Sequence, residues 1–437
     1  MSIGAITLVT VLALLVLLFT GFPVAFCLIG IAVAGFLIFV GPASLYAVLA
    51  AAFAMATKDI FIAAPLFIFM ASVLQFSGIA TALYDTMYKW FAGLRGGLAM
   101  GTVAICALIA AMTGVTATGT LTMGMLAYPE MRKRGYDKMM AIGCIPFGGA
   151  LGPIIPPSVV MIIVGGFGSL SVGKLFIGGI IPGVMMAFLA TVYIFVRCSR
   201  KPELGPAIPL DERASWREKF VSLRGTILPI LLIILVLGGI YAGAFTPTEA
   251  GGIGAFGAVI CAAINRQLNW QNVKEAALTT FRVTAMIIWI AIGGASFSSF
   301  LGMTGVLHFV NDFMIGLPLS PMGIIIVMMA IVFVMGMFID PMGIVMITLP
   351  IFMPICTALG FDPLWFGLLF TMNLLIGYLT PPFGINLFYF KGLGYAEVSM
   401  MDIYRSVIPY VVVMLIVLVL CIAFPELLLW LPNKMIK

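Results

Sequence analysis

Apolar stretches long enough to cross a membrane follow one another along most of the chain, and short polar turns separate them. An α-helix needs about 20 apolar residues to span the hydrocarbon core, and segments such as 23–40 and 174–196 are close to that length. The long polar stretch at 197–224 divides the pattern in two. We therefore expect an all-α polytopic membrane protein with a first half over 1–196, a cytoplasmic linker over 197–224 and a second half over 225–437.

Two of the expected spans are interrupted by prolines. The motif Gly-x-x-x-Pro-Pro begins at Gly152 in the first half and at Gly377 in the second, 225 residues apart. Proline lacks a backbone donor and disfavours helix at the residue before it, so carbonyl groups at these breaks lose their helical partners. At membrane depth such carbonyls are tolerated only against protein or beside a water-filled cavity. We expect broken helices over 139–168 and 364–390, and their pairing indicates a transport site.

Two longer apolar segments, 98–131 and 321–354, precede the broken helices. As a single helix each would be about 51 Å long, against a hydrocarbon core of about 30 Å, so a re-entrant helical hairpin fits better. Arg95 and the basic run 132–134 flank the first segment, which places both of its ends on the cytoplasmic side. The ends of the second segment carry no Lys or Arg and fit the opposite side. The two halves are then inverted repeats, each with one hairpin and one broken helix.

The other elements recur in the same order in both halves. Three anchor pairs lie 227 residues apart: Gly78 with Gly305, Asp85 with Asp312, and Pro182 with Pro409. The inverted arrangement puts 18 of the 22 Lys and Arg residues on the cytoplasmic side. The expected elements are spans over 3–20, 23–40 and 60–77, an interfacial arm over 43–57 and an amphipathic helix over 79–92, matched by spans over 226–244, 247–264 and 283–303, an arm over 267–281, an amphipathic helix over 305–316 and a final span over 406–424.

Composition supports the same class and excludes others. The 437 residues are 63% hydrophobic and 9% charged, with a mean hydropathy of +1.23, which a soluble protein could not bury. The net charge of +6 comes from short loops, so it does not indicate nucleic acid as a partner. The seven Cys are scattered without disulfide or metal spacing. Ile3 to Thr20 lacks a basic leader and a cleavage site, so we expect a retained span. Without a Walker loop, haem ligands or a zinc signature, neither an enzyme nor an ATP-driven pump is indicated.

Oxygen atoms suited to a small cation gather at the first hairpin tip and the first break. Thr113, Thr116 and Thr118 offer hydroxyl groups, and Gly152 and Ile155 offer backbone carbonyls. A second set combines the carbonyls of Gly336 and Gly377, the hydroxyl of Thr380 and the backbone of Phe383. For any one residue the alternative is structural, because Thr bonds back to its own helix and Gly permits close packing. The duplication of the set favours function.

Further polar residues at membrane depth are candidates for binding the substrate. Asp340 lies at the second hairpin tip, where it either serves function or caps a helix. Asn373 and Asn386 flank the second break and could bond a substrate or a neighbouring helix. No Lys or Arg lies at this depth, so the charge of a carboxylate substrate would be met by bound cations, by hydroxyls such as that of Thr118, and by the half-helix N-termini near Ser158 and Phe383.

Taken together, these motifs resemble the large membrane (M, DctM-like) subunit of tripartite ATP-independent periplasmic (TRAP) transporters, over essentially the whole chain. The resemblance rests on the runs PEMRKRGYDK (129–138), GGALGPIIPPSVVMII (148–163), SVGKLFIGGIIPG (171–183) and GYLTPPFGINLF (377–388). It implies an elevator-type secondary transporter of the ion-transporter superfamily in the bacterial inner membrane, surrounded by lipid and driven by Na⁺. It also implies two partners, a small four-helix membrane (Q) subunit and a periplasmic substrate-binding (P) protein.

The resemblance further implies about two Na⁺ sites. The first would use hydroxyls at the first hairpin tip, where the family has a Ser-Gly-Ser-like run and this chain has Thr113-Gly114-Val115, and backbone before the double proline. The matching positions are Thr113, Thr116, Gly152, Ile155 and Pro157 for the first site, and Gly336, Gly377, Thr380 and Phe383 for the second.

The sequence thus leads to the hypothesis of sodium-coupled secondary active import of an organic acid delivered by a periplasmic binding protein. Family members carry dicarboxylates, keto acids or sialic acids, and the membrane motifs do not distinguish among them. The alternatives are a standalone divalent-anion:sodium symporter, which needs no binding protein, and a channel, whose flux would not depend on a sodium gradient.

Overall fold

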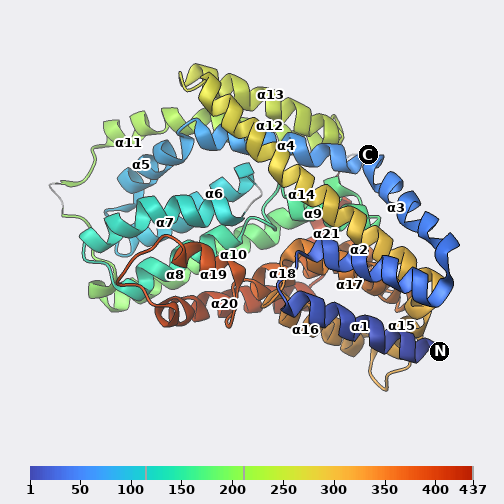
Figure 1. The fold of residues 1–437 in the computed structure, drawn as a ribbon. Coiled ribbons are helices and arrows are strands. Elements are labelled where there is room, and N and C mark those ends of the chain that lie inside the picture. Colours follow the sequence, from blue (N-terminus) through green and yellow to red (C-terminus); the bar gives the residue numbers. More distant parts are fainter. Residues whose placement is uncertain (114–115, 210–211, 436–437) are drawn as a thin grey trace.

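The computed structural model describes residues 1–113, 116–209 and 212–435, and every regular element in these ranges is helical (Figure 1). Five of the described helices are long and apolar enough to cross a membrane, or up to seven spans if each bent helix pair counts as one. The prediction of an all-helical, multi-span protein with broken helices is therefore confirmed.

The first half contains twelve helical segments within the described residues. They are α1 (Ile3–Phe19), α2 (Val24–Gly35), a π-helical turn (Phe36–Val40), a 3-10 turn (Pro42–Leu45), α3 (Tyr46–Ala56), α4 (Ile60–Phe76), α5 (Ile79–Phe91), α6 (Gly97–Thr113), α7 (Thr116–Lys133), α8 (Lys138–Ala150), α9 (Val159–Gly168) and α10 (Val172–Arg200). Because α10 continues to Arg200, the linker begins later than its expected start at residue 197.

The linker and the second half contain the remaining described elements. They are a 3-10 turn (Pro202–Leu204), α11 (Trp216–Ser222), α12 (Arg224–Tyr241), α13 (Pro247–Ile264), α14 (Trp270–Met303), α15 (Val306–Ile315), α16 (Pro321–Gly336), α17 (Pro341–Ala358), α18 (Pro363–Gly377), α19 (Ile385–Lys391), α20 (Met400–Ala423) and α21 (Glu426–Asn433).

Each half carries a helix pair, a broken helix and a long helix in the same order. The pairs α6–α7 and α16–α17 fall on the two 34-residue segments, and the helices of each pair contact each other. The breaks between α8 and α9 and between α18 and α19 fall on the two Gly-x-x-x-Pro-Pro motifs. Gly78 and Gly305 cap the matching helices α5 and α15 with φ values of +71° and +77°, a backbone conformation that glycine adopts at little cost.

The halves differ at the expected arm of the second half. In the first half α3 and α4 are separate helices that meet at an angle of 52°, and the polar residues Thr57, Lys58 and Asp59 lie at the bend. In the second half, α14 runs unbroken through both the expected arm at 267–281 and the expected span at 283–303. No Gly or Pro interrupts its sequence before Gly293, so nothing ends the helix. The prediction of a separate second arm is wrong.

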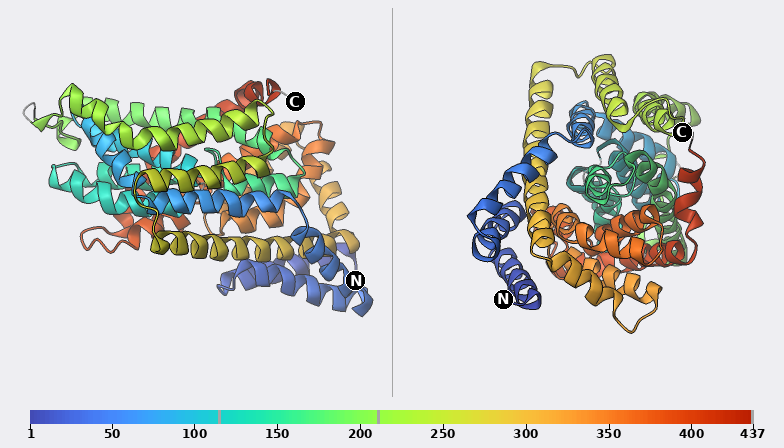
Figure 2. Two further views of the ribbon diagram at one scale, coloured as in Figure 1. Left: turned by 90° about the horizontal axis from the view of Figure 1, so that it is seen from above. Right: turned by 90° about the vertical axis from the view of Figure 1, so that its right-hand side faces the viewer.

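The helices around the breaks form the centre of the molecule, and α14 lies along one side. In the right-hand view of Figure 2, α1–α3 and α14 stand on one flank, and the helices of both breaks fill the interior. Helix α14 contacts α2, α3, α4 and α17. The interior is shared between the halves, because α9 packs on α17 and α18, while α7 and α8 pack on α19.

Helix starts in this interior are fixed by capping side chains. Ser158 begins α9 and Asp340 begins α17, each accepting a hydrogen bond from a backbone N–H of the first turn. The first turn of a helix has unpaired N–H groups, which are costly away from water. These caps allow helices to start inside the molecule, which the broken topology requires.

Candidate functional site

A cavity of about 150 Å³ lies where the two helix-pair tips meet the two breaks. Its lining comes from both halves, and within the second half α14 supplies Val283 and Met286. The other lining residues are Thr116 and Ala117 at the first tip, Pro153, Val159 and Val160 at the first break, Asp340, Pro341 and Met342 at the second tip, and Tyr378, Ile385 and Tyr389 at the second break. Segments predicted separately from the sequence thus surround one cavity.

Asp340 is the only formally charged side chain among the described residues of the lining. Its Oδ1 accepts a hydrogen bond of 2.9 Å from the backbone N–H of Met342, so it caps α17. Asp340 therefore both caps α17 and lines the cavity. A carboxylate at membrane depth is costly and usually functional.

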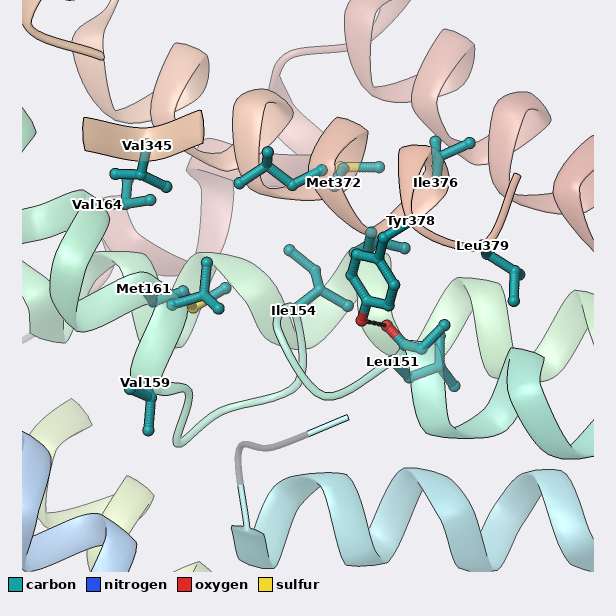
Figure 3. Packing of buried hydrophobic residues seen from close by; sticks show 14 of the residues in the cluster. Leu151, Ile154, Val159, Met161, Val164, Val345, Met372, Ile376, Tyr378 and Leu379 are labelled. Carbon is teal, nitrogen blue, oxygen red and sulfur yellow. Dashed lines mark hydrogen bonds between the residues drawn. The ribbon is translucent and has the colours of Figure 1, made fainter. Parts of the chain in front are cut away.

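Tyr378 joins the second break to the first half. Its hydroxyl donates to the carbonyl oxygen of Ala150 at 3.0 Å (Figure 3) and lies 2.7 Å from the hydroxyl of Thr116. Because the tyrosine proton is used on Ala150, the Thr116 hydroxyl is the donor in the second bond. Tyr378 was not among the site residues predicted from the sequence, although a polar side chain inside the second break was a visible signal.

A second polar connection between the halves lies deeper. The Asn386 amide nitrogen donates to the Pro146 carbonyl at 2.6 Å, and its oxygen accepts from the Thr120 hydroxyl at 2.7 Å. Both Asn386 and Thr120 are buried. Asn386 therefore holds α19 against α7 and α8 and is not part of the cavity lining. Thr120 is a further polar contact that was not among the site residues predicted from the sequence.

The second candidate Na⁺ set comes together where the second tip meets the second break. A Cβ atom on Gly336 would lie 2.9 Å from the Cα of Gly377, and one on Gly377 would lie 2.8 Å from the Cα of Gly336. Only glycine permits so close an approach of two backbones. The Thr380 hydroxyl donates to the Ile376 carbonyl at 2.7 Å, which leaves its lone pairs available to a ligand.

Phe383 lies on the outer side of this junction. Its side chain is 52% exposed, and its ring centre is 5.5 Å from that of Phe338 at the second tip. The neighbouring Gly384 donates its backbone N–H to the Met337 carbonyl at 3.1 Å, which holds the break to the tip. The four positions of the second set thus lie on two segments that contact each other directly.

The first candidate set is described only in part. Thr113 is the last residue of α6, and its side chain, together with Gly114 and Val115, lies outside the described residues. Gly152 is buried in the first break, where its N–H donates to the Gly149 carbonyl at 3.3 Å. Ile155 and Pro157 follow in the same break, with the Ile155 N–H donating to the Leu151 carbonyl at 3.0 Å. Among the described side chains of this set, Thr116 lines the cavity.

The remaining candidates lie outside the described lining of the cavity. The Ser158 hydroxyl donates to the Pro153 carbonyl at 2.8 Å and caps α9, which fixes the loop of the first break. The Asn373 amide donates to the Met329 carbonyl at 2.5 Å and ties α18 to α16. Thr118 is half-buried on α7. Among the described residues, no group of three His, Cys, Asp or Glu side chains could hold a metal ion.

Two hairpin-like helix pairs and two broken helices surround one cavity. This arrangement is typical of membrane transport proteins whose binding site is built from interrupted helices. The fold is similar to that of the Alcanivorax borkumensis YdaH transporter, with a TM-score of 0.65, 14% sequence identity and coverage of 97% of this chain and 99% of that one. At this identity the likeness shows the fold alone.

The family follows from the sequence itself. The family "Tripartite ATP-independent periplasmic transporter, DctM component" matches residues 11–427. The chain is 31% identical to the C4-dicarboxylate TRAP transporter large permease protein DctM of Pseudomonas aeruginosa, over 85% of this chain and 86% of that one. It is 30% identical to the ectoine/5-hydroxyectoine TRAP transporter large permease protein UehC of Ruegeria pomeroyi, over 97% of both chains.

The chain belongs to the DctM family of TRAP transporter large permeases. It is a multi-pass protein of the bacterial inner membrane and a transporter component, not an enzyme. The resemblance drawn from its motifs is confirmed.

Proposed function

We propose that this chain is the large permease of an importer that couples the inward movement of Na⁺ to the uptake of an organic acid. The observation that carries the proposal is the convergence of both tips and both breaks on one cavity. Backbone carbonyls and Thr hydroxyls at these tips and breaks are hard oxygen ligands, which suit a small cation. The relatives are named for C4-dicarboxylates and for ectoine, so the class of substrate proposed here is an organic acid.

The proposed partners follow from the tripartite family and from the name of the relatives as large permeases. A small membrane subunit would sit beside this chain, and a periplasmic binding protein would deliver the substrate. The alternative is a standalone symporter, which would need neither a small membrane subunit nor a binding protein.

Reconstituted transport separates the proposed function from this alternative. The permease and its proposed small subunit are placed in proteoliposomes, and uptake of candidate organic acids is followed with and without the proposed periplasmic binding protein. We expect uptake only when the binding protein is present. Equal uptake in its absence would favour the standalone symporter.

The proposal includes an elevator movement of the site. All candidate ligands lie in the two helix pairs and the two broken helices, so they would move as one body against α1–α4 and α12–α14. The cavity supports this division, because α14 supplies one wall and the breaks and tips supply the rest. A contact between the two bodies is the hydrogen bond of 2.9 Å from Lys58 Nζ to the Gly166 carbonyl in the last turn of α9.

The inverted repeat predicts that the two helix pairs open to opposite sides of the membrane. With single Cys residues at Arg95 or Lys133, a membrane-impermeant thiol reagent should label the protein from the cytoplasm. With Cys at Pro318 or Ala358, it should label from the periplasm. All four positions are exposed, and Gly96 is avoided because a Cβ there would lie 2.9 Å from the sulfur of Cys198. Labelling of the two ends of one helix pair from different sides would rule out the re-entrant arrangement.

A further inference from the structure

A groove of about 650 Å³ runs between α10 and α20, away from the cavity between the tips and breaks. Its walls are apolar, with Leu189, Val192 and Val196 on α10 facing Val413 and Ile416 on α20. Val192, Val196 and Ile416 are exposed. Exposed aliphatic side chains on membrane-spanning helices face lipid, so the groove opens to the bilayer.

One end of the groove is strongly basic. Arg197, Arg200 and Lys201 line it where α10 ends, and all three are exposed. Arg197 donates to the hydroxyl of Tyr193, and its guanidinium lies 5.7 Å from the centre of that ring. The described residues form four ion pairs, and none of them involves these three cations.

The dimensions of the groove match one leaflet of a membrane. From Leu189 to Arg200 the helix rises about 16 Å, which is about half of the ~30 Å hydrocarbon core. The basic end lies beside the other cations expected on the cytoplasmic side, because Gly96, next to Arg95, packs against Cys198 of α10. The cytoplasmic leaflet carries anionic lipids, and basic pockets between helices on that side bind their headgroups.

We propose that the groove between α10 and α20 is a binding site for an anionic phospholipid of the cytoplasmic leaflet. The acyl chain lies along Val192, Val196 and Ile416, and the phosphate headgroup lies among Arg197, Arg200 and Lys201. A free phosphate ion would use only the basic end, and a neutral lipid only the apolar walls. An anionic lipid has a group for each part of the groove, an acyl chain for the apolar walls and a phosphate for the basic end.

The test is a lipid titration of the delipidated full-length protein followed by native mass spectrometry. Phosphatidylglycerol should bind at least about tenfold more tightly than phosphatidylcholine, since each cation near a headgroup contributes to the attraction. The triple variant Arg197→Gln, Arg200→Gln and Lys201→Gln should bind phosphatidylglycerol roughly a hundredfold more weakly. The double variant Val192→Trp and Ile416→Trp fills the apolar part and should lose both lipids.

The matched control removes three exposed cations elsewhere, with Arg266→Gln, Lys274→Gln and Arg282→Gln on and beside α13 and α14. It should bind phosphatidylglycerol like the wild type, and inorganic phosphate should not displace the lipid. Equal losses in the two triple variants, or equal binding of the two lipids by the wild type, would overturn the proposal. So would loss of the bound lipid when the small membrane subunit is added, because the groove would then hold a protein helix.

Discussion

Replacing Gly377 with alanine should remove most of the stabilisation that we expect Na⁺ to give to this protein. A methyl group at this position would lie 2.8 Å from the Cα of Gly336 and 3.1 Å from the Phe333 carbonyl oxygen. Neither atom can rotate away, because both belong to the backbone of α16. The second tip and the second break would have to separate, and such overpacking costs typically about 1–3 kcal/mol. The separation would pull apart the proposed ligands of the second Na⁺ site.

Thermal unfolding in detergent measures this effect without knowledge of the substrate. A ligand that binds only the folded state raises the melting temperature with its concentration. For the wild type we expect a higher Tm in sodium chloride than in potassium chloride, and for Gly377→Ala a difference less than half as large. Gly302→Ala on α14 is the matched control, since a Cβ there meets no atom within 4 Å. A sodium-dependent rise in Gly377→Ala equal to that of the wild type would contradict the second site.

Replacing Tyr378 with phenylalanine should weaken apparent Na⁺ and substrate affinity together, by about tenfold. The change deletes one oxygen atom and leaves the Ala150 carbonyl and the Thr116 hydroxyl without their present partner. An unpaired buried polar group costs about 1–3 kcal/mol. The loss would loosen the second break from the first tip and from the first break. Because the proposed transport couples Na⁺ binding to substrate binding, a weaker Na⁺ site also lowers the apparent affinity for substrate.

The sodium dependence of uptake, with the binding protein present, measures the effect of Tyr378→Phe. The half-saturating concentrations of Na⁺ and of substrate should both rise, whereas capture of substrate by the binding protein should not change. Tyr46→Phe on α3, where the side chain is 76% exposed, removes the same atom far from the cavity and should behave as the wild type. A Tyr378→Phe variant with unaltered sodium dependence would show that this bridge is only structural.

The sequence predicted the broken helices and the tips because local chemistry determines them. The double prolines after Gly152 and Gly377 prevent a continuous helix whatever surrounds them. The apolar segments 98–131 and 321–354 exceed the thickness of a membrane and carry a Gly-containing polar tract at the centre, which favours a turn there. The candidate residues Thr116, Asp340 and Gly377 fall on these features, which is why the structure places them at the tips and breaks.

Contacts between the halves could not be predicted in this way. Tyr378 reaches Thr116, and Asn386 reaches Thr120, across more than 260 residues of chain. These pairs depend on how the two halves pack, which the repeat alone does not determine. The unbroken α14 was missed because the prediction followed the repeat too closely. The first half has a bend at Thr57–Asp59, and the second half lacks it.

Sodium-coupled import requires that a sodium gradient alone drives accumulation of the organic acid. Proteoliposomes with the permease, its small subunit and the binding protein are given an inward sodium gradient, an equal potassium gradient, or equal sodium on both sides. We expect accumulation of the organic acid above its external concentration only with the inward sodium gradient, with Na⁺ entry that requires substrate. Equal uptake in all three conditions, or Na⁺ entry without substrate, would contradict sodium-coupled transport and favour a channel.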